Sequence, residues 1–292
     1  MAELFKILQP LQFMQSFVNS GKRPDGRNFL EYRDVLLSCN NITSANGSAL
    51  IKFGSSSVLC GLTMAIVKPE MNRPEEGILS IDVRFSSTIS NEIDNPDRTT
   101  YSSYVRECLL KILVNSKFID LRELCLIPRK KAWQISAEIV CLNMDGCIID
   151  QSLIVLLAAL KKCRFPRYDV NAEFEMITKT DEMIGLKFLH IPIINTFSII
   201  NNNILVDPTM NEEDLSDSLI RIAIDPDSAD RIDSDAIYLL EVTGSASMDE
   251  LNLTTIFQKA SQRSKFLKKL ILKHCDESST KEDLIKFEAM DI

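Results

Sequence analysis

The chain has 292 residues, of which 45% are hydrophobic and 25% are charged, as is typical of a globular protein that buries a sizeable core. Its net charge of −8 argues against nucleic-acid binding through the overall field of the chain and leaves a local basic groove as the alternative. No apolar run approaches the roughly 20 residues of a membrane span, and the acidic start Met1-Ala2-Glu3 is unlike a signal peptide.

The first part of the chain predicts a short helix followed by several strands. An amphipathic lead-in helix is expected over Pro10–Asn19 and is ended by the following Gly21. A basic turn comes next, at Lys22–Arg27. Strand patterns separated by turn residues occur at 34–39, 48–53, 57–67 and 78–85. A polar loop at 88–98 then leads into a helical pattern at 101–117.

The middle of the chain predicts a strand, a tight turn and a buried helix. Apolar and polar residues alternate from Trp133 to Cys141, the pattern of a half-buried strand. The turn Asp145–Asp150 follows, and the helix expected over Gln151–Lys162 has no polar face between residues 153 and 160. Because such a turn presents backbone N–H groups at a helix N-terminus, it is a candidate site for an anion such as phosphate.

The second part predicts another set of short strands and one long helix. Pro166 breaks the pattern, and strands are expected at 184–189, 193–200, 204–207, 219–224 and 236–241. The acidic connector 225–235 lacks the Gly and terminal Glu of a calcium loop, so we expect a solvated loop. A capping box at Ser247–Glu250 begins a long helix with a basic C-terminal end.

These elements indicate an α+β fold. We expect a lead-in helix at 1–20, a single domain at 21–273, and a charged, disordered tail at 274–292. The domain would consist of two packed halves, at about 21–165 and 166–273.

Few residues carry recognisable chemistry. Gly-x-Ser-x-Gly, Walker and Gly-x-Gly-x-x-Gly motifs are absent, and eight scattered cysteines with two histidines lack zinc spacing, which favours reduced core thiols. No cofactor or metal is therefore expected. The acidic run Asp207–Asp217 has two interpretations: carboxylates that bind magnesium or act as a general acid, or a solvated turn with helix-capping acids.

Six separated stretches, taken in order, resemble the RNase PH family. They are Arg23–Arg27, Gly47–Gly54, Leu124–Pro128 before Trp133, Asp145-Gly146 with Asp150, Leu156–Leu160, and Val206–Thr209 with Glu212-Glu213. The resemblance covers roughly residues 5 to 272. It implies one α+β domain of two βαβ-type halves, six of which close into a ring around an RNA channel. Active members cleave the 3′ end of RNA with inorganic phosphate and release nucleoside diphosphates.

The chain departs from the active members of that family at two places. Their turn before the buried helix carries a Gly-Thr/Ser-Arg signature that holds the phosphate. Here Ile149 and Asp150 stand in that turn, where neither can grip a phosphate dianion and Asp150 would repel it. Leu219 falls at the position of the family's second acid, and Asp217 lies two residues earlier. These four residues are expected to be degenerate active-site positions.

The preferred hypothesis is a non-catalytic structural subunit of the RNase PH-like ring of the RNA exosome, acting in rRNA processing and mRNA turnover. Its expected partners are other RNase PH-like subunits, cap subunits, a separate hydrolytic nuclease, and RNA in the assembled channel. The resemblance also implies the nucleus, nucleolus and cytoplasm. Two alternatives stay open: a phosphate-dependent 3′-to-5′ exoribonuclease whose site a neighbour completes, and an RNA-binding module outside any ring.

Basic residues that could contact RNA are Lys22, Arg23, Arg27, Arg84 and Arg98. The first three have an equally good structural alternative, because they could form salt bridges across the N-terminal turn.

Overall fold

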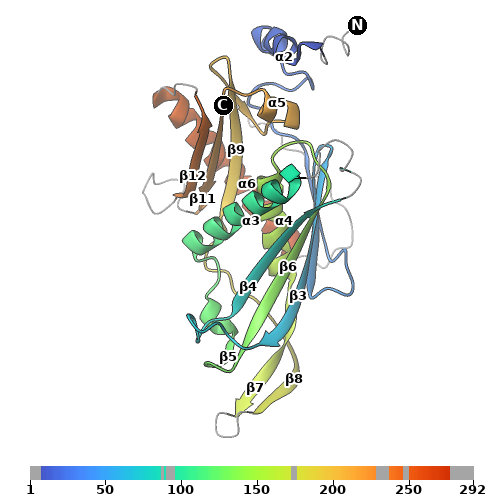
Figure 1. Ribbon diagram of the computed structural model, residues 1–292, viewed down its shortest axis with the longest axis vertical. Coiled ribbons are helices and arrows are strands. Elements are labelled where there is room, and N and C mark those ends of the chain that lie inside the picture. Colours follow the sequence, from blue (N-terminus) through green and yellow to red (C-terminus); the bar gives the residue numbers. More distant parts are fainter. Residues whose placement is uncertain are drawn as a thin grey trace.

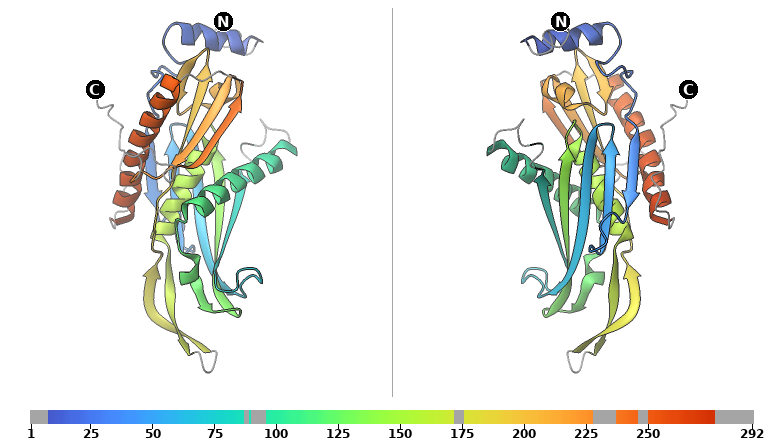
Figure 2. Two further views of the ribbon diagram at one scale, coloured as in Figure 1. Left: turned by 90° about the vertical axis from the view of Figure 1, so that its left-hand side faces the viewer. Right: turned by 90° about the vertical axis from the view of Figure 1, so that its right-hand side faces the viewer.

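The computed structural model describes residues 8–86, 89, 96–171, 176–227, 237–245 and 250–276. The chain forms an elongated molecule with two β-sheets, a β-hairpin at one end, and the lead-in helix α2 (Pro10–Asn19) at the other (Figure 1). Helix α2 has the bounds that the sequence predicts. The two side views show the long helix α6 (Glu250–Asp276) running beside the sheets (Figure 2).

The first sheet is built from the strands that the first half of the sequence predicts, together with the short strand β5 (Cys125–Ile127), which was not predicted. In spatial order they are β1 (Val35–Cys39), β2 (Gly47–Phe53), β3 (Ser56–Val67), β6 (Lys131–Asn143) and β4 (Ile78–Phe85), with β5 also paired to β6. All pairs are antiparallel except β4 with β6. That parallel pair requires a crossover, which helix α3 (Pro96–Ser116) and the short 3-10 helix η2 (Leu121–Leu124) provide.

The second sheet is antiparallel throughout. Its order is β10 (Asn203–Val206), β9 (Ile193–Ile200), β11 (Ser218–Ile224) and β12 (Ile237–Gly244). The short helix α5 (Met210–Asp214) connects β10 to β11, and α6 packs against β9 and β11. Together the two sheets and their helices confirm the α+β prediction.

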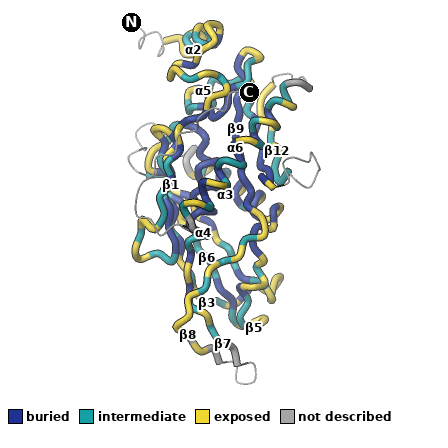
Figure 3. Tube along the Cα trace, turned by 180° about the vertical axis from the view of Figure 1, so that it is seen from behind, coloured by how far each residue is buried: buried dark blue, intermediate teal, exposed yellow. Residues whose placement is uncertain are grey.

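Helix α4 (Ile148–Lys162) forms the core on which both sheets are assembled. Every residue from Ile148 to Leu160 is buried, as the absence of a polar face predicts. The helix contacts β1, β2, β3 and β6 of the first sheet, β9 of the second, and helices α3 and α6. Gly47 allows β2 to approach closely, because a Cβ there would lie 2.5 Å from the carbonyl oxygen of Ala159. Figure 3 shows buried segments running through the middle of the molecule and exposed ones at α2 and the outer turns.

One hairpin was not predicted by the sequence. Strands β7 (Arg164–Asn171) and β8 (Met176–Gly185) pair where the sequence indicated a break at Pro166 and a later strand at 184–189. Pro166 is accommodated because the pairing register shifts next to it, at a bulge in a two-stranded sheet. The hairpin is anchored by Phe165, whose ring packs edge-on against Trp133 at 5.3 Å. The predicted boundary between the halves therefore falls inside β7.

Other predictions differ from the structure in extent. Helix α3 begins at Pro96, inside the predicted polar loop, and residues 88 and 90–95 of that loop lie outside the described residues. Most of the acidic connector, the start of the capping box before α6, and the tail from residue 277 also lie outside the described residues. All seven cysteines whose side chains are described are free thiols. Within the described ranges, no helix is long and apolar enough to cross a membrane.

Candidate functional site

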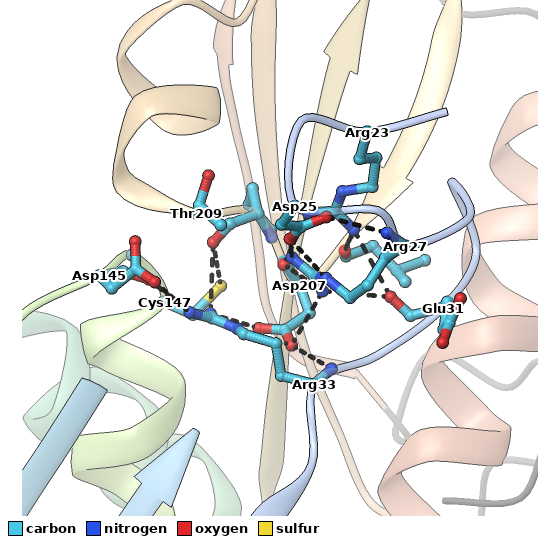
Figure 4. Close-up of polar contacts among 12 residues, drawn as sticks. Arg23, Asp25, Arg27, Glu31, Arg33, Asp145, Cys147, Asp207 and Thr209 are labelled. Carbon is cyan, nitrogen blue, oxygen red and sulfur yellow. Dashed lines mark hydrogen bonds and ion pairs between the residues drawn. The ribbon is translucent and has the colours of Figure 1, made fainter. Parts of the chain in front are cut away.

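Three segments far apart in the sequence meet at one end of α4 (Figure 4). They are the N-terminal turn at 23–33, the turn before α4 at 145–147, and the acidic segment at 207–214. Each carries one of the motifs that resemble the RNase PH family. Their residues form a polar network between the two sheets.

Arg23 is enclosed by this network and has no face toward solvent. Its Nε donates to Glu212 Oε1 at 2.8 Å, its Nη1 to the carbonyl oxygen of Val206 at 2.8 Å, and its Nη2 to that of Asp207 at 3.1 Å. Nη2 also pairs with the second carboxylate oxygen of Glu212, and the two side chains are 0% and 1% exposed. An RNA phosphate would have to break this ion pair to reach Arg23, so the geometry favours the salt-bridge alternative.

Arg33 and Asp207 make a second buried ion pair. Nη2 and Nε of Arg33 donate to the two Asp207 oxygens at 2.6 and 3.0 Å, and Nη1 reaches the carbonyl oxygen of Asp145 at 2.5 Å. Burial alone would raise the pKa of Asp207, but the adjacent charge and hydrogen bonds of Arg33 hold it well below its usual range. Sequence reasoning missed Arg33, whose only signal was a charged residue directly before the first strand.

The other basic candidates fall in different surroundings. Arg27 pairs with Asp25 at 2.7 Å and approaches Asp207 at 3.5 Å, again as the salt-bridge alternative expects. Lys22 is exposed. Arg84 is 63% exposed and pairs with the carboxylates of Asp82 and Glu138, both at 2.8 Å. The side chain of Arg98 lies outside the described residues.

The turn before α4 is pressed against the acidic segment. Gly146 has φ +77°, and a Cβ there would lie 2.4 Å from the carbonyl oxygen of Pro208, so glycine is required for both conformation and space. Cys147 follows with φ 53° as the N-cap of α4. Its N–H donates to Glu213 Oε1 at 2.7 Å. The helix N-terminus that the sequence offers to an anion thus already binds a carboxylate of the same chain.

Asp150 does not face this turn. Its two oxygens accept hydrogen bonds from the N–H and the hydroxyl of Thr196 at 2.8 and 2.7 Å, which ties α4 to β9. Burial raises the pKa of Asp150 to about 7. Ile149 is also buried, in the main hydrophobic core. The expected repulsion of phosphate by Asp150 must be corrected accordingly, because its carboxyl group points into the protein.

A cavity of about 610 Å³ opens beside the turn, between α3, α5, β11 and the end of β4. Its apolar lining is Phe85, Tyr101, Tyr104, Met144, Met210 and Leu219. Leu219, the residue predicted to stand at the position of the second acid, is thus one of the side chains that line the cavity. Asp217 is not among the lining residues, because its carboxylate accepts the N–H of Asn201 at 2.8 Å in the turn between β9 and β10.

The acidic run is less solvated than the sequence suggested. Glu212 and Asp207 are only 1% and 4% exposed, which contradicts a fully solvated turn. The capping part of that interpretation is confirmed, since Glu212 accepts the N–H of Thr209 at 2.8 Å in a capping box for α5. Within the described part of the chain, no group of three His, Cys, Asp or Glu side chains could hold a metal ion.

Comparison with known families identifies the class of protein that this fold defines. Residues 31–166 match domain 1 of the 3′ exoribonuclease family, RNase PH, and residues 190–263 match domain 2. The chain belongs to this family.

Its relatives narrow the class further. The chain is 31% identical to exosome complex component rrp43 of Schizosaccharomyces pombe, over 76% of this chain and 82% of that one. It is 29% identical to exosome complex component Rrp42 of Thermococcus gammatolerans, over 72% and 77% of the two chains. A chain of the Archaeoglobus fulgidus exosome with RNA bound to the active site has the same fold, with a TM-score of 0.75 at 24% identity over 89% of this chain and 96% of that one.

Proposed function

We propose that this chain is a non-catalytic structural subunit of the RNase PH-like ring of an RNA exosome and supports 3′-to-5′ RNA processing and degradation. Its partners would be other RNase PH-like subunits, cap subunits, an associated hydrolytic nuclease, and RNA in the channel. Membership of the family and the exosome components among its relatives support the ring. The opening of the chain also resembles that of exosome component 8, which stays a prediction.

The observation that carries the non-catalytic part is the bond between Cys147 and Glu213. Phosphorolysis requires inorganic phosphate to enter the site as a dianion and attack the RNA backbone. The amide at the N-terminus of α4 already binds the Glu213 carboxylate, and the exposed Asp214 lies next to it. A phosphate ion would have to displace one negative charge and lie beside another. Leu219, in the same cavity, offers no proton and no metal ligand.

The test is a phosphorolysis assay on the chain alone and in its assembled ring. Either form is incubated with a 3′-tailed RNA and inorganic phosphate, with a phosphorolytic ring of the same family as positive control. We expect no phosphate-dependent release of nucleoside diphosphates. Release by the ring that is lost on Glu213→Ala or Asp214→Ala would overturn the proposal and favour a site completed by a neighbour. Asp217→Ala serves as the control, since that carboxylate lies outside the cavity.

Two further measurements test whether the chain assembles into a ring and where it is found in the cell. The native mass of the endogenous protein should be that of a multi-subunit complex, whereas a free monomer in cell extract would exclude the ring. We expect a fluorescently tagged chain in the nucleus, nucleolus and cytoplasm, the compartments of rRNA processing and mRNA turnover. Exclusion from the nucleolus would contradict a role in rRNA processing.

A further inference from the structure

A non-catalytic subunit would not use the cavity beside the turn for phosphorolysis, yet the cavity is large. Its volume of about 610 Å³ lies within the range of binding pockets. One wall is aromatic: the rings of Phe85 and Tyr101 stack at 5.8 Å with 28° between their planes, and Tyr104 follows at 6.2 Å. Met144 and Met210 add flexible thioether side chains, which adapt to apolar groups of varied shape.

The charged groups of the cavity are mainly acidic. Glu213 and Asp214 contribute two carboxylates, whereas Arg221 contributes one guanidinium. Arg221 is already engaged, since its Nη1 lies 3.0 Å from the hydroxyl of Tyr104 and 3.5 Å from the Glu241 carboxylate. Its side chain is only 9% exposed. Glu213 is partly compensated by the Cys147 N–H and by the nearby charges of Arg221 and Arg33. The excess negative charge that a ligand meets therefore comes mainly from the exposed Asp214.

This charge decides between two occupants that an aromatic cavity could accept. An unpaired RNA base could stack on Phe85 and Tyr101, but its phosphates would then lie close to Glu213 and Asp214. An apolar protein side chain would fill the same space without that repulsion, and an adjacent Lys or Arg would pair with Asp214, which is exposed. The acidic rim favours the protein.

We propose that the cavity receives an apolar side chain flanked by a Lys or Arg, carried by a neighbouring protein subunit of the ring. The inference rests on the proposed non-catalytic role, because it gives a docking function to a cavity that would otherwise have to be free for a substrate. The apolar side chain would pack between the aromatic wall and Leu219, and the basic residue would lie over Asp214.

Site-specific photo-cross-linking in the intact complex tests the proposal. Thr100, an exposed residue lining the cavity, is replaced by p-benzoylphenylalanine, and the complex purified from cells is irradiated and digested. We expect an RNase-resistant cross-link to one protein subunit, mapping to a segment with an apolar residue beside a Lys or Arg. The same probe at Met183, 56% exposed on the distant β7–β8 hairpin, should not yield that peptide.

A charge reversal gives the second readout. Asp214→Lys should lower the yield of the cross-link by up to about fivefold, the upper end of the effect of losing one exposed ion pair. Glu182→Lys, at an exposed acid on β8, should leave the yield unchanged. A cross-link to RNA, or none above the Met183 control, would overturn the docking proposal. Since neither readout measures catalysis, a failure here is distinct from nucleoside diphosphate release in the phosphorolysis assay, which would overturn the proposed role itself.

Discussion

Replacing Arg23 by Met should destabilise the protein strongly, because it leaves the Glu212 carboxylate buried without a counter-charge. The two side chains are 0% and 1% exposed, and Arg23 also satisfies the carbonyl oxygens of Val206 and Asp207. Removing one partner of such a pair costs about 3–5 kcal/mol. That is a large share of the roughly 5–15 kcal/mol that stabilises a typical domain. At about 2–4 °C per kcal/mol, the melting temperature should fall by roughly 6–20 °C.

Urea unfolding followed by the fluorescence of Trp133, the single tryptophan, measures this effect directly. Trp133 is 5% exposed, so its emission changes when the core opens. The matched control is Arg84→Met, which removes solvent-exposed ion pairs and should cost less than about 1 kcal/mol. The double variant Arg23→Met/Glu212→Gln should recover part of the loss, because no buried charge is left unpaired. Equal costs for Arg23→Met and Arg84→Met would refute the reasoning.

Two further predictions concern α4 and the turn before it. Burial raises the pKa of Asp150 to about 7, so between about pH 4 and pH 7 the folded chain holds a proton that the unfolded chain has released. The unfolding free energy of the wild type, compared with that of the Asp150→Asn variant, should therefore fall by up to about 4 kcal/mol as the pH rises through that window. Above the window, the difference between the two unfolding free energies should stay constant. Urea titrations at several pH values check this, and a difference independent of pH would contradict it. Gly146→Ala should lower the unfolding free energy by clearly more than the roughly 1–2 kcal/mol that an alanine in the left-handed conformation costs, because its Cβ would meet the Pro208 carbonyl oxygen. The control is Gly26→Ala, at φ +89° with no atom within 4 Å, which should cost only that amount. Equal melting temperatures of the two variants would argue against the close contact.

The sequence predicts most strands because their burial determines the order of their residues. A strand buried on one face alternates apolar and polar residues, and a strand buried on both faces is a continuous apolar run. Strand β9 (Ile193–Ile200) has the predicted bounds, and all eight residues are buried. The hairpin β7–β8 escaped because Pro166 and charged neighbours interrupt the alternation, while its anchor, the contact of Phe165 with Trp133, is a tertiary one. A local pattern cannot reveal such a contact.

The candidate site was predictable in its segments but not in its bonds. The motif residues Asp145, Asp207 and Glu212 stood out in the sequence, and they do meet. Their partners are set by the packing of two sheets: Arg33 bonds Asp207 across 174 residues, and Glu213 reaches the amide of Cys147 across 66. No spacing rule links such positions. Asp150 is a further example: the sequence placed it in the turn that begins the buried helix, but its hydrogen bonds with Thr196 could not be predicted.

These bonds explain why the motifs predict the family more firmly than the activity. Arg23, Arg33, Asp207 and Glu212 satisfy one another in the interior, and a buried polar network is tolerated only when every member is paired. The motif residues are therefore required by the fold, whether or not the chain performs phosphorolysis. The proposed lack of activity concerns other groups, those that face the cavity, where Leu219 offers neither a proton nor a metal ligand. The motifs can therefore be kept for the sake of the fold alone, because their residues hold the two sheets together.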